Sequence, residues 1–314
     1  MTKVFIDGSE GTTGLRIFER FEGRNDIEIL KIDPELRKNP EEIKNFINAS
    51  DVTFLCLPDQ AAIEAVELCD NDNTVIIDTS TAHRTNPDWA YGFPELSDEH
   101  RNKIKTGKRI AVPGCYATGF ISLVYPLVKG GILPKDYPVS CFAISGYSGG
   151  GKKLIAEYEN PERDKKYGSA RTYAWTQSHK HLKEMKAVTG IDRAPLFNPL
   201  TTDYYSGMLV EVPLYADMLG EKKTPEEIRD YLAKFYEGEQ FIRVNEFGAE
   251  AQTGNILFSD AASGWDGLEI FVTGNEERIV VASRFDNLGK GASGAAVQCL
   301  NAVLGVDEAT GLNL

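Results

Sequence analysis

The sequence predicts an α/β protein with a doubly wound parallel Rossmann sheet, followed by an α+β domain with a mainly antiparallel sheet. Three observations lead to this prediction. Short apolar runs alternate with helical patterns up to about residue 112. Two of these runs, residues 52–57 and 75–78, are nearly continuous in apolar residues, as strands covered on both faces are. After about residue 138 the strand patterns become longer and alternate apolar with polar residues.

The first half is expected to begin with a strand, a glycine turn at residues 8–14 and a helix from about Leu15. Leu15, Phe18 and Phe21 are spaced to share one face of that helix. A second helix starts at Pro40, because proline is tolerated in the first turn, where its missing N–H costs no hydrogen bond. A third helix is predicted at residues 61–69, and strands at residues 4–6, 27–32, 52–57, 75–78 and 109–112.

The second half is predicted to hold longer strands and a well-capped helix. That helix spans residues 224–236, with Thr224 as its N-cap and Pro225 as its first residue. Strands are expected at residues 139–145, 205–213, 241–243 and 278–285, and an apolar helix of small residues at 294–304. We expect a dinucleotide-binding domain at residues 1–116, completed by residues 287–314, and a catalytic and oligomerisation domain at residues 117–286.

The length and charge of the chain restrict its function. The 314 residues suit two domains, and 42% of them are hydrophobic, enough for a sizeable core. The formal net charge is −13. This charge argues against nucleic acid or an anionic membrane as a partner, because phosphate groups bind to positive faces. An anionic small-molecule substrate needs only a local basic pocket.

Several features favour a cytoplasmic protein. The five cysteines have no CxxC spacing, which favours thiols in a reducing compartment over a disulfide scaffold. The first residues form a strand pattern and lack the apolar run of a signal peptide. The uncharged run at residues 110–128 is interrupted by Pro113, Gly114 and Pro126, so a buried strand, turn and helix fit it better than a membrane span.

A glycine turn follows the first strand and opens the first helix. Gly8, Gly11 and Gly14 are spaced as Gly-x-x-Gly-x-x-Gly, with Thr12 and Thr13 inside the turn. Glycines let the backbone approach a pyrophosphate, and N–H groups at the helix start attract its negative charge. The turn is therefore a candidate dinucleotide site. A tight strand-to-helix connection without a ligand is the alternative.

The residues after the second strand bear on which dinucleotide binds. Asp33 could bind a ribose 2′-hydroxyl and favour NAD, whereas Arg37 and Lys38 could bind a 2′-phosphate and favour NADP. All three could also be solvated loop charges. We favour NADP(H) as the cofactor.

Cys115 is the most informative residue of the chain. A strand ends at Val112, Pro113 and Gly114 turn, and a helical run begins at about Tyr116. Cys115 would then lie at a helix N-terminus, where the helix dipole and the N–H groups stabilise a thiolate. The other cysteines lie within or near the ends of apolar elements, so we expect packing roles for them: Cys56, Cys69, Cys141 and Cys299.

An activated thiol needs a proton-transfer partner, and the chain has four histidines, of which two are strong candidates. His100 lies in a charged run and is expected to be solvated. His179 and His181 precede a helical segment, and an acid/base or substrate-binding role is expected for them. Their spacing could also suit a metal, but no carboxylate or cysteine nearby completes a familiar ligand set, so no metal site is predicted.

Together these segments resemble the shorter form of the N-acetyl-γ-glutamyl-phosphate reductases of arginine biosynthesis, which belong to the semialdehyde dehydrogenase group. The most specific match is Pro113-Gly-Cys-Tyr-Ala-Thr118 paired with Asp286-Asn-Leu-Gly-Lys-Gly-Ala-Ser-Gly294. The resemblance covers nearly the whole chain. It also includes the glycine turn and residues 77–84, 91–96, 145–150 and 179–181.

The resemblance implies NADPH-dependent conversion of N-acetyl-glutamyl 5-phosphate to its semialdehyde and phosphate by a homo-oligomeric enzyme. Cys115 would be the nucleophile that forms a thioester, and His179 the general acid/base. The residues implied for the substrate are Arg84, His181 and Ser145. Those implied for the cofactor, beside the glycine turn and residues 37 and 38, are Gly149, Asn287 and Lys290.

Three other readings remain open. Aspartate-semialdehyde dehydrogenases share this architecture and thiol chemistry, although the His179-Lys-His181 segment favours an acetylglutamyl substrate. A short-chain dehydrogenase would fit the glycine turn and the Tyr125-x-x-x-Lys129 spacing, but Pro126 falls inside what should be its catalytic helix. A non-enzymatic NADP-binding sensor would not need a reactive Cys115.

Overall fold

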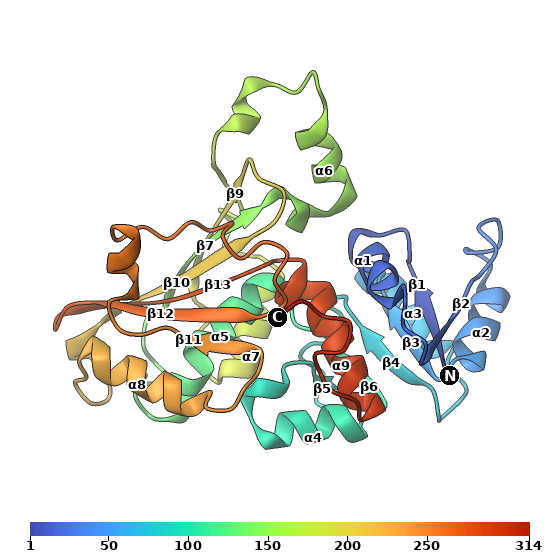
Figure 1. The fold of residues 1–314 in the computed structure, drawn as a ribbon, viewed down its shortest axis with the longest axis horizontal. Helices are drawn as coiled ribbons and strands as arrows, with labels where there is room; N and C mark the ends of the chain where they lie inside the picture. Colours follow the sequence, from blue (N-terminus) through green and yellow to red (C-terminus); the bar gives the residue numbers. More distant parts are fainter. The chain divides into compact units, whose positions relative to one another are not determined.

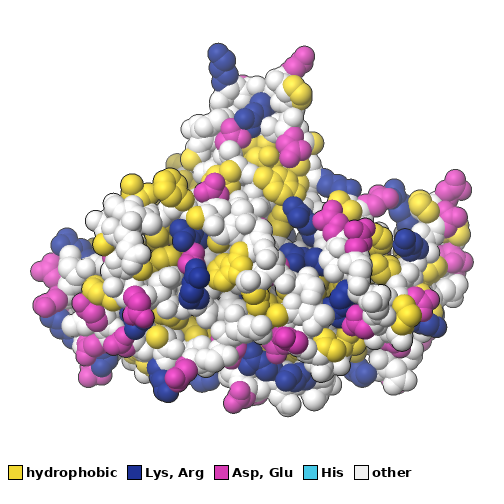
Figure 2. Space-filling view, in the orientation of Figure 1, with side chains coloured by type: hydrophobic (Ala, Val, Ile, Leu, Met, Phe, Trp, Pro, Cys, Tyr) yellow, Lys and Arg dark blue, Asp and Glu magenta, His cyan; other side chains and the backbone are white.

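The computed structural model describes all 314 residues, which form two compact units. The first unit comprises residues 1–114 with residues 292–313, and the second comprises residues 115–291 with Leu314. None of the five cysteines forms a disulfide. No helix is both long and apolar enough to span a membrane. Acidic and basic side chains are interspersed over the surface in the view of Figure 2.

The first unit is built on a six-stranded sheet in the order β2-β1-β3-β4-β6-β5, and every neighbouring pair is parallel. Parallel strands need crossover connections, and helices supply most of them here. The strands are β1 (Thr2–Asp7), β2 (Ile27–Leu30), β3 (Val52–Leu55), β4 (Val75–Asp78), β5 (Ala90–Tyr91) and β6 (Arg109–Ala111). The helices are α1 (Thr12–Phe21), α2 (Pro40–Ala49), α3 (Asp59–Glu67), α4 (Asp98–Thr106) and α9 (Gly294–Leu304).

Helices cover both faces of this sheet (Figure 1). Successive side chains of a strand point to opposite faces, so Val4 and Ile6 of β1 lie on one side and Phe5 on the other. Val4 and Ile6 share a hydrophobic cluster with residues of α1, α4 and α9. Phe5 shares a second cluster with residues of α2 and α3. The predicted doubly wound parallel sheet is therefore confirmed.

Helix α1 begins earlier and turns a different face inward than the sequence pattern suggested. Its buried residues are Gly14, Ile17 and Phe21, whereas Leu15 is 48% exposed. The cause is the glycine turn, because a Cβ on Gly14 would lie only 2.4 Å from the carbonyl oxygen of Gly8. This close approach fixes the rotation of the helix and leaves Leu15, one residue further around it, facing solvent.

The second unit contains a seven-stranded sheet in the order β11-β12-β13-β10-β7-β9-β8. Strands β12, β13, β10 and β7 pair antiparallel in succession, as do β9 and β8, whereas β11 and β9 join their inner neighbours in parallel. The sheet is thus mixed and mainly antiparallel, as predicted. Its strands are β7 (Ser140–Gly146), β8 (Arg171–Thr172), β9 (Leu196–Thr202), β10 (Met208–Tyr215), β11 (Ile242–Val244), β12 (Leu268–Gly274) and β13 (Arg278–Phe285).

Helices α5 and α8 pack against this sheet, and α7 packs against α5. The bounds of the helices are α5 (Cys115–Lys129), α6 (Gly151–Glu159), α7 (His181–Thr189) and α8 (Pro225–Phe235). Thr224 and Glu227 form a reciprocal capping box at the start of α8, which confirms the predicted helix start. The strand expected at residues 205–213 begins only at Met208. Gly207 adopts a φ of +121° there, and its Cα approaches the backbone of Asp260 too closely for a side chain.

Helix α5 continues through Pro126, which lacks the N–H that would bond the carbonyl of Ser122. The hydroxyl of Tyr236 donates to that carbonyl at 2.7 Å and replaces the missing bond. The carbonyl of Pro126 in turn accepts from the hydroxyl of Tyr231 at 2.9 Å. Side chains from α8 and its C-terminal end thus keep a proline-containing helix intact.

Gly119 sets the distance between α5 and the sheet. A Cβ at this position would lie 2.5 Å from Cγ2 of Val210 on β10 and 2.9 Å from the ring of Phe285 on β13. Both neighbours are fully buried, so neither side chain can move aside. Only glycine therefore lets α5 pack this closely on the sheet.

We expect Gly119→Ala to destabilise the protein by about 1–3 kcal/mol, because the added methyl group overpacks the contact with Val210. Urea unfolding followed by circular dichroism measures this change. Gly168→Ala is the matched control, since a Cβ there would meet nothing closer than Asp203 at 4.0 Å. A surface change of this kind should stay within about 0.5 kcal/mol of the parent. Equal effects at the two positions would contradict the proposed constraint.

Candidate active site

Cys115 is the first residue of α5 and directly follows the turn at Pro113 and Gly114. No acidic residue lies in the first turn of the helix, so the partial positive charge of the helix N-terminus is not offset there. A thiolate at this position is stabilised by the helix. The expected placement of Cys115 at a helix start is confirmed.

The other cysteines have settings that suit packing. Burial raises the pKa of the Cys56 thiol to about 12, and burial also raises that of Cys141. Cys299 is fully buried, with its Sγ 3.6 Å from the carbonyl oxygen of Gly92. The thiols of Cys56 and Cys141 are therefore protonated near neutral pH.

The segment after β13 lies directly against Cys115. A Cβ on Gly291 would be 3.0 Å from the Cβ of Cys115 and 3.1 Å from the ring of Phe285, so a side chain here would force its neighbours to shift. The Asp286 carboxylate holds the segment by accepting from the backbone N–H groups of Leu288 at 2.7 Å and Gly264 at 2.6 Å. The N–H of Gly291 donates to the carbonyl of Asp286 at 3.1 Å. This geometry explains why these glycines accompany the cysteine segment.

Tyr116, the residue after the thiol, is the centre of an aromatic cluster. Its ring lies 6.0 Å from the ring of His179 and 5.9 Å from that of His181, measured between centroids. Phe197 lies 5.2 Å from Tyr116 and 5.1 Å from His179. The hydroxyl of Tyr173 donates to that of Tyr116 at 2.8 Å. The second unit therefore brings the neighbour of the thiol together with both candidate histidines.

Burial raises the pKa of the Tyr116 hydroxyl well above its usual range, and burial does the same for Tyr173. The charge of a Cys115 thiolate raises both values further, so the two hydroxyls lie within its electrostatic reach. Both tyrosines stay neutral and can serve as hydrogen-bond donors. Their part in the site was not anticipated from the sequence, because nothing local marks an aromatic residue that packs against segments far along the chain.

His179 is half-buried, and its Nδ1 accepts a hydrogen bond from the backbone N–H of His181 at 3.2 Å. The neutral ring therefore carries its proton on Nε2. Burial lowers the pKa of His179 to about 4, and the positive charge of Lys180 adds to this decrease. The imidazole is thus neutral near pH 7, with Nε2 as the donor.

The remaining histidines have different surroundings. His181 is buried as the first residue of α7, one turn before the buried Glu184. His100 is partly exposed, and its Nδ1 is hydrogen-bonded to the hydroxyl of Ser97, the N-cap of α4, at 2.8 Å. His83 is buried, and its Nδ1 lies 2.7 Å from the Asp78 carboxylate.

Ser145, Gly149 and Asn287 lie together in the second unit. A Cβ on Gly149 would be 3.2 Å from the hydroxyl of Ser145 and 3.5 Å from the side-chain nitrogen of Asn287. The Asn287 amide is fixed, because Nδ2 donates to the hydroxyl of Ser148 at 2.9 Å and Oδ1 accepts from the N–H of Gly207 at 2.9 Å. Segments widely separated in the sequence thus meet at one place.

Lys290 is buried in the second unit. Only 1% of its surface is exposed, and its Nζ lies 4.9 Å from the ring centroid of Phe241. A cation above an aromatic ring is stabilised by the negative face of the ring. This contact gives the Lys290 charge a structural partner inside the unit.

The glycine turn of the first unit has the geometry that a dinucleotide requires. Gly8 has a φ of +82°, and a Cβ there would lie 2.4 Å from the carbonyl oxygen of Cys56. Gly11 is the N-cap of α1 and offers no side-chain cap, so the N–H groups of the first turn remain for a ligand. The hydroxyl of Thr12 is buried without a hydrogen-bond partner in the protein. A pyrophosphate would satisfy these donors, so the turn fits NADP(H).

The charged residues after β2 are exposed, as a site for the cofactor's ribose requires. Arg37 forms an ion pair with Glu10 of the glycine turn, which holds the guanidinium group beside that turn. The Asp33 carboxylate accepts from the backbone N–H of Glu35 at 2.9 Å. Lys38 is exposed next to Arg37.

Arg84 is buried in the first unit and binds backbone carbonyls. Its Nε donates to Val112 at 2.8 Å and its Nη2 to Thr79 at 2.9 Å. The guanidinium group therefore ties the end of β4 to the end of β6. Beside it, the His83 ring stacks on Trp89 with a centroid distance of 4.0 Å. This contact could not be predicted from the spacing of the residues.

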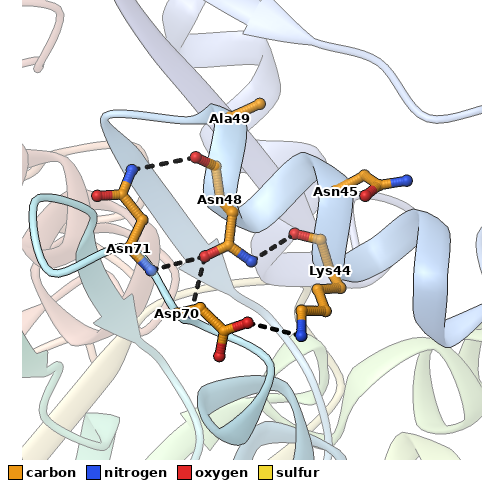
Figure 3. Close-up of a pocket in the computed structure, with 6 residues that line it drawn as sticks. All are labelled: Lys44, Asn45, Asn48, Ala49, Asp70 and Asn71. Carbon is orange, nitrogen blue, oxygen red and sulfur yellow. Dashed lines mark hydrogen bonds and ion pairs between the residues drawn. The ribbon is translucent and has the colours of Figure 1, made fainter.

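The protein also has two hollows, one beside the aromatic cluster and one on the first unit. Beside the aromatic cluster, a pocket of about 160 Å³ is lined by residues that include Tyr173, Gln177 and Phe197. Figure 3 shows a second hollow, on the first unit, where Asn48 accepts from the backbone N–H groups of Asp70 and Asn71. These bonds fasten the segment after α3 to α2, so we interpret the second hollow as structural.

Comparison with known proteins identifies two family models in the chain. A model described as "Semialdehyde dehydrogenase, NAD binding domain" matches residues 3–104. A model described as "Semialdehyde dehydrogenase, dimerisation domain" matches residues 115–287. Together the two matches cover most of both compact units.

Similar curated proteins include N-acetyl-gamma-glutamyl-phosphate reductase 2 of Nostoc sp., which is 43% identical over 99% of each chain. The N-acetyl-gamma-glutamyl-phosphate reductase of Brucella ovis is 43% identical over 96% of this chain and 99% of its own. Among solved structures, aspartate semialdehyde dehydrogenase from Francisella tularensis superimposes with a TM-score of 0.72 and 14% identity, covering 97% of this chain and 100% of that one. This structural likeness concerns the fold alone.

We expect the His179 imidazole to titrate near pH 4 in an NMR pH titration, well below the usual 6.5, because burial disfavours the charged ring. Lys180→Gln should raise this pKa only partly, since the charge of Lys180 is the smaller cause. The depressed pKa means that the unfolded chain binds this proton first. His179 therefore contributes stability above pH 6.5 that is lost as the pH falls towards 4. A His179 resonance that titrates at 6.5 would contradict this prediction.

Proposed function

The chain belongs to the semialdehyde dehydrogenase family, and we propose that it reduces N-acetyl-γ-glutamyl phosphate to the corresponding semialdehyde and phosphate, using NADPH, as a step of arginine biosynthesis. The observation that carries this proposal is the placement of Cys115 at the start of α5, beside the cluster that holds His179. The extent of the match to the curated reductases supports the choice of substrate.

In the proposed first step, the Cys115 thiolate attacks the acyl carbonyl carbon of the substrate. A C–S bond forms, the bond from that carbon to the phosphate oxygen breaks, and phosphate leaves with the electron pair. The acyl group is then held on Cys115 as a thioester. The start of α5 favours this step because it stabilises the thiolate before attack. NADPH, when bound at the glycine turn, supplies the hydride for the reduction of the acyl carbon.

We assign to His179 the hydrogen bond to the substrate oxygen. Its Nε2 is the donor, because Nδ1 is engaged by the N–H of His181. A donor aimed at this oxygen stabilises the negative charge that develops on it. As a neutral ring, His179 acts through its Nε2 hydrogen bond, which stabilises the oxygen of the tetrahedral adduct on Cys115, and that oxygen expels the thiolate when the C–S bond breaks and the aldehyde leaves. Tyr116 and Tyr173 hold the ring in place, since the centroid of each tyrosine ring lies 6.0 Å from that of His179.

The proposal also gives roles to the other residues that the resemblance implied. His181, Ser145 and Arg84 are assigned to the anionic substrate, since imidazole, hydroxyl and guanidinium groups all bind carboxylate or phosphate oxygens. Gly149, Asn287 and Lys290 are assigned to the cofactor, together with the glycine turn and with Arg37 and Lys38. A catalytic thiolate also needs a reducing compartment, which supports a cytoplasmic location.

We further infer that copies of the chain associate through the open face of the seven-stranded sheet. Phe142 lies on β7, an inner strand, yet its side chain is 46% exposed, because no helix of this chain covers it. Tyr215 on the adjacent β10 is 58% exposed. Exposed aromatic side chains on a central strand suit a buried interface. The match of this unit to a dimerisation domain supports the inference.

The test of the proposed function is the reverse reaction: phosphate-dependent reduction of NADP, followed at the absorbance of NADPH. We expect turnover with N-acetyl-glutamate semialdehyde and little with aspartate semialdehyde, because the chain matches the acetylglutamyl reductases in sequence. Preference for aspartate semialdehyde would overturn the choice of substrate and leave the thiol chemistry in place. Activity with neither would favour an NADP-binding sensor.

Cys115→Ala is the control for that assay. It should abolish turnover and leave the affinity for NADPH within about twofold of the parent, since the thiol forms the covalent intermediate and the glycine turn binds the cofactor. The variant should also lose the single fast-reacting thiol that iodoacetamide labels in the parent near neutral pH. Full activity of Cys115→Ala would exclude a covalent intermediate on Cys115.

Phe142→Glu should shift the purified chain towards monomer in sedimentation-velocity measurements, because it places a charge in the proposed interface. Leu36→Glu is the matched control, since Leu36 is 41% exposed and belongs to the first unit, not to this sheet. It should leave the assembly unchanged. A parent chain that sediments as a monomer would exclude the interface, and so would an oligomer that survives Phe142→Glu.

A further inference from the structure

The loop between Tyr173 and His179 is held in a costly conformation. Ala174 has a φ of 54° and Gln177 a φ of 55°, both in the left-handed region that residues other than glycine rarely adopt. Such strain persists only where surrounding contacts fix it, and it concentrates at functional sites. The loop leads directly to His179, so the contacts that fix the loop also bear on the position of this ring.

The side chain of Gln177 binds β9 as a neighbouring strand would. Its Nε2 donates to the carbonyl of Phe197 at 2.8 Å, and its Oε1 accepts from the N–H of Phe197 at 2.9 Å. The short strand β8 pairs with β9 only at Leu200 and Thr201, so it does not reach Phe197. One carboxamide therefore satisfies both edge groups of a buried residue, which would otherwise lack partners.

Phe197 connects the Gln177 side chain to His179. The Gln177 amide fixes the Phe197 backbone, and the Phe197 ring lies 5.1 Å from that of His179. The other end of the loop is fixed by Tyr173, whose hydroxyl bonds that of Tyr116, the residue next to the thiol. The loop is thus tied at one end to the helix that carries Cys115 and at the other to the ring against which His179 rests.

We propose that Gln177 is a positioning residue for His179: its paired hydrogen bonds to Phe197 lock the strained loop and hold the imidazole in the orientation that directs Nε2 at the substrate oxygen. This inference rests on the role proposed above for His179. Gln177 itself touches no reacting atom. Its contribution is a fixed geometry, and small displacements of a catalytic group reduce the rate steeply.

The test compares Gln177→Ala and Gln177→Met. Both remove the two hydrogen bonds, and methionine keeps the length of the side chain. We expect kcat to fall between about 10-fold and 100-fold in each variant, while KM for the acyl phosphate changes by less than about twofold. A merely structural role would lower the thermal midpoint without this separation of kcat from KM. Parent-like kcat in Gln177→Met would show that shape, and not hydrogen bonding, matters, and would overturn the proposal.

An NMR titration of His179 in the same variants gives a readout that does not depend on activity. A released loop lets water reach the imidazole, so its pKa should rise from about 4 towards the usual 6.5. An unchanged pKa in both variants would overturn the proposal. If Gln177→Ala does not fold, the methionine variant carries the test alone.

Asn245→Ala is the matched control. Asn245 is also a carboxamide at an edge of the same sheet, where its Nδ2 donates to the carbonyl of Ile270 at 3.2 Å. Asn245 directly follows β11, at the edge of the sheet opposite to β9 and β8, which hold Phe197 and lead to the strained loop. In this variant kcat and the His179 pKa should therefore not change. His179→Asn separates the two proposals. If it keeps full activity, the role proposed for His179 fails, whereas the titration still reports whether Gln177 holds the ring.

Discussion

The contact of Gly119 with Val210 and Phe285 is the constraint on which the second unit depends. It brings α5 close enough to the sheet for the carbonyl of Gly119 to accept from the hydroxyl of Ser283 at 3.2 Å. The position of the first residue of the helix follows from this packing, and that residue is Cys115. The location of the thiol is therefore set by core packing four residues further along, and not by contacts of the thiol alone.

The groups around the thiol are held in place by hydrogen bonds. The Asp286 carboxylate organises one side through backbone N–H groups, and the Tyr116–Tyr173 pair organises the other. Preorganised groups of this kind need little rearrangement when a substrate arrives. The low pKa of His179 follows from the same packing, because the aromatic rings that orient the imidazole also exclude water from it.

Local patterns in the sequence were sufficient for much of the fold. The strand at Arg278–Phe285, the proline-started helix α2 and the capped helix α8 all have signals within a few residues, and each is present. Strand β9 was missed, because Asn198 and Pro199 interrupt its apolar pattern and its place is decided by pairing with β7. The exposed position of Leu15 was missed for a similar reason, since the glycine turn controls the rotation of α1.

The candidate site could likewise be predicted only in part from the sequence. Cys115 was recognisable from the Pro-Gly turn before a helical run, and the glycine turn from its spacing. The surroundings of His179 were not, because Tyr116, Tyr173 and Phe197 come from different parts of the chain and meet only after folding. The hydrogen bonds of Arg84 to the carbonyls of Val112 and Thr79 could not be predicted either, because nothing in a sequence indicates which backbone groups a buried guanidinium will bind.

The contact between Gly291 and Cys115 links two positions that are far apart in the chain. A side chain at 291 would press at once on the Cβ of Cys115, on the ring of Phe285 and on the carbonyl oxygen of Asp286. The contact with Cys115 involves its Cβ and not its sulfur, so any residue except glycine at 115 makes the same contact. A descendant that replaced the thiol with serine or alanine would therefore still need a small residue at 291.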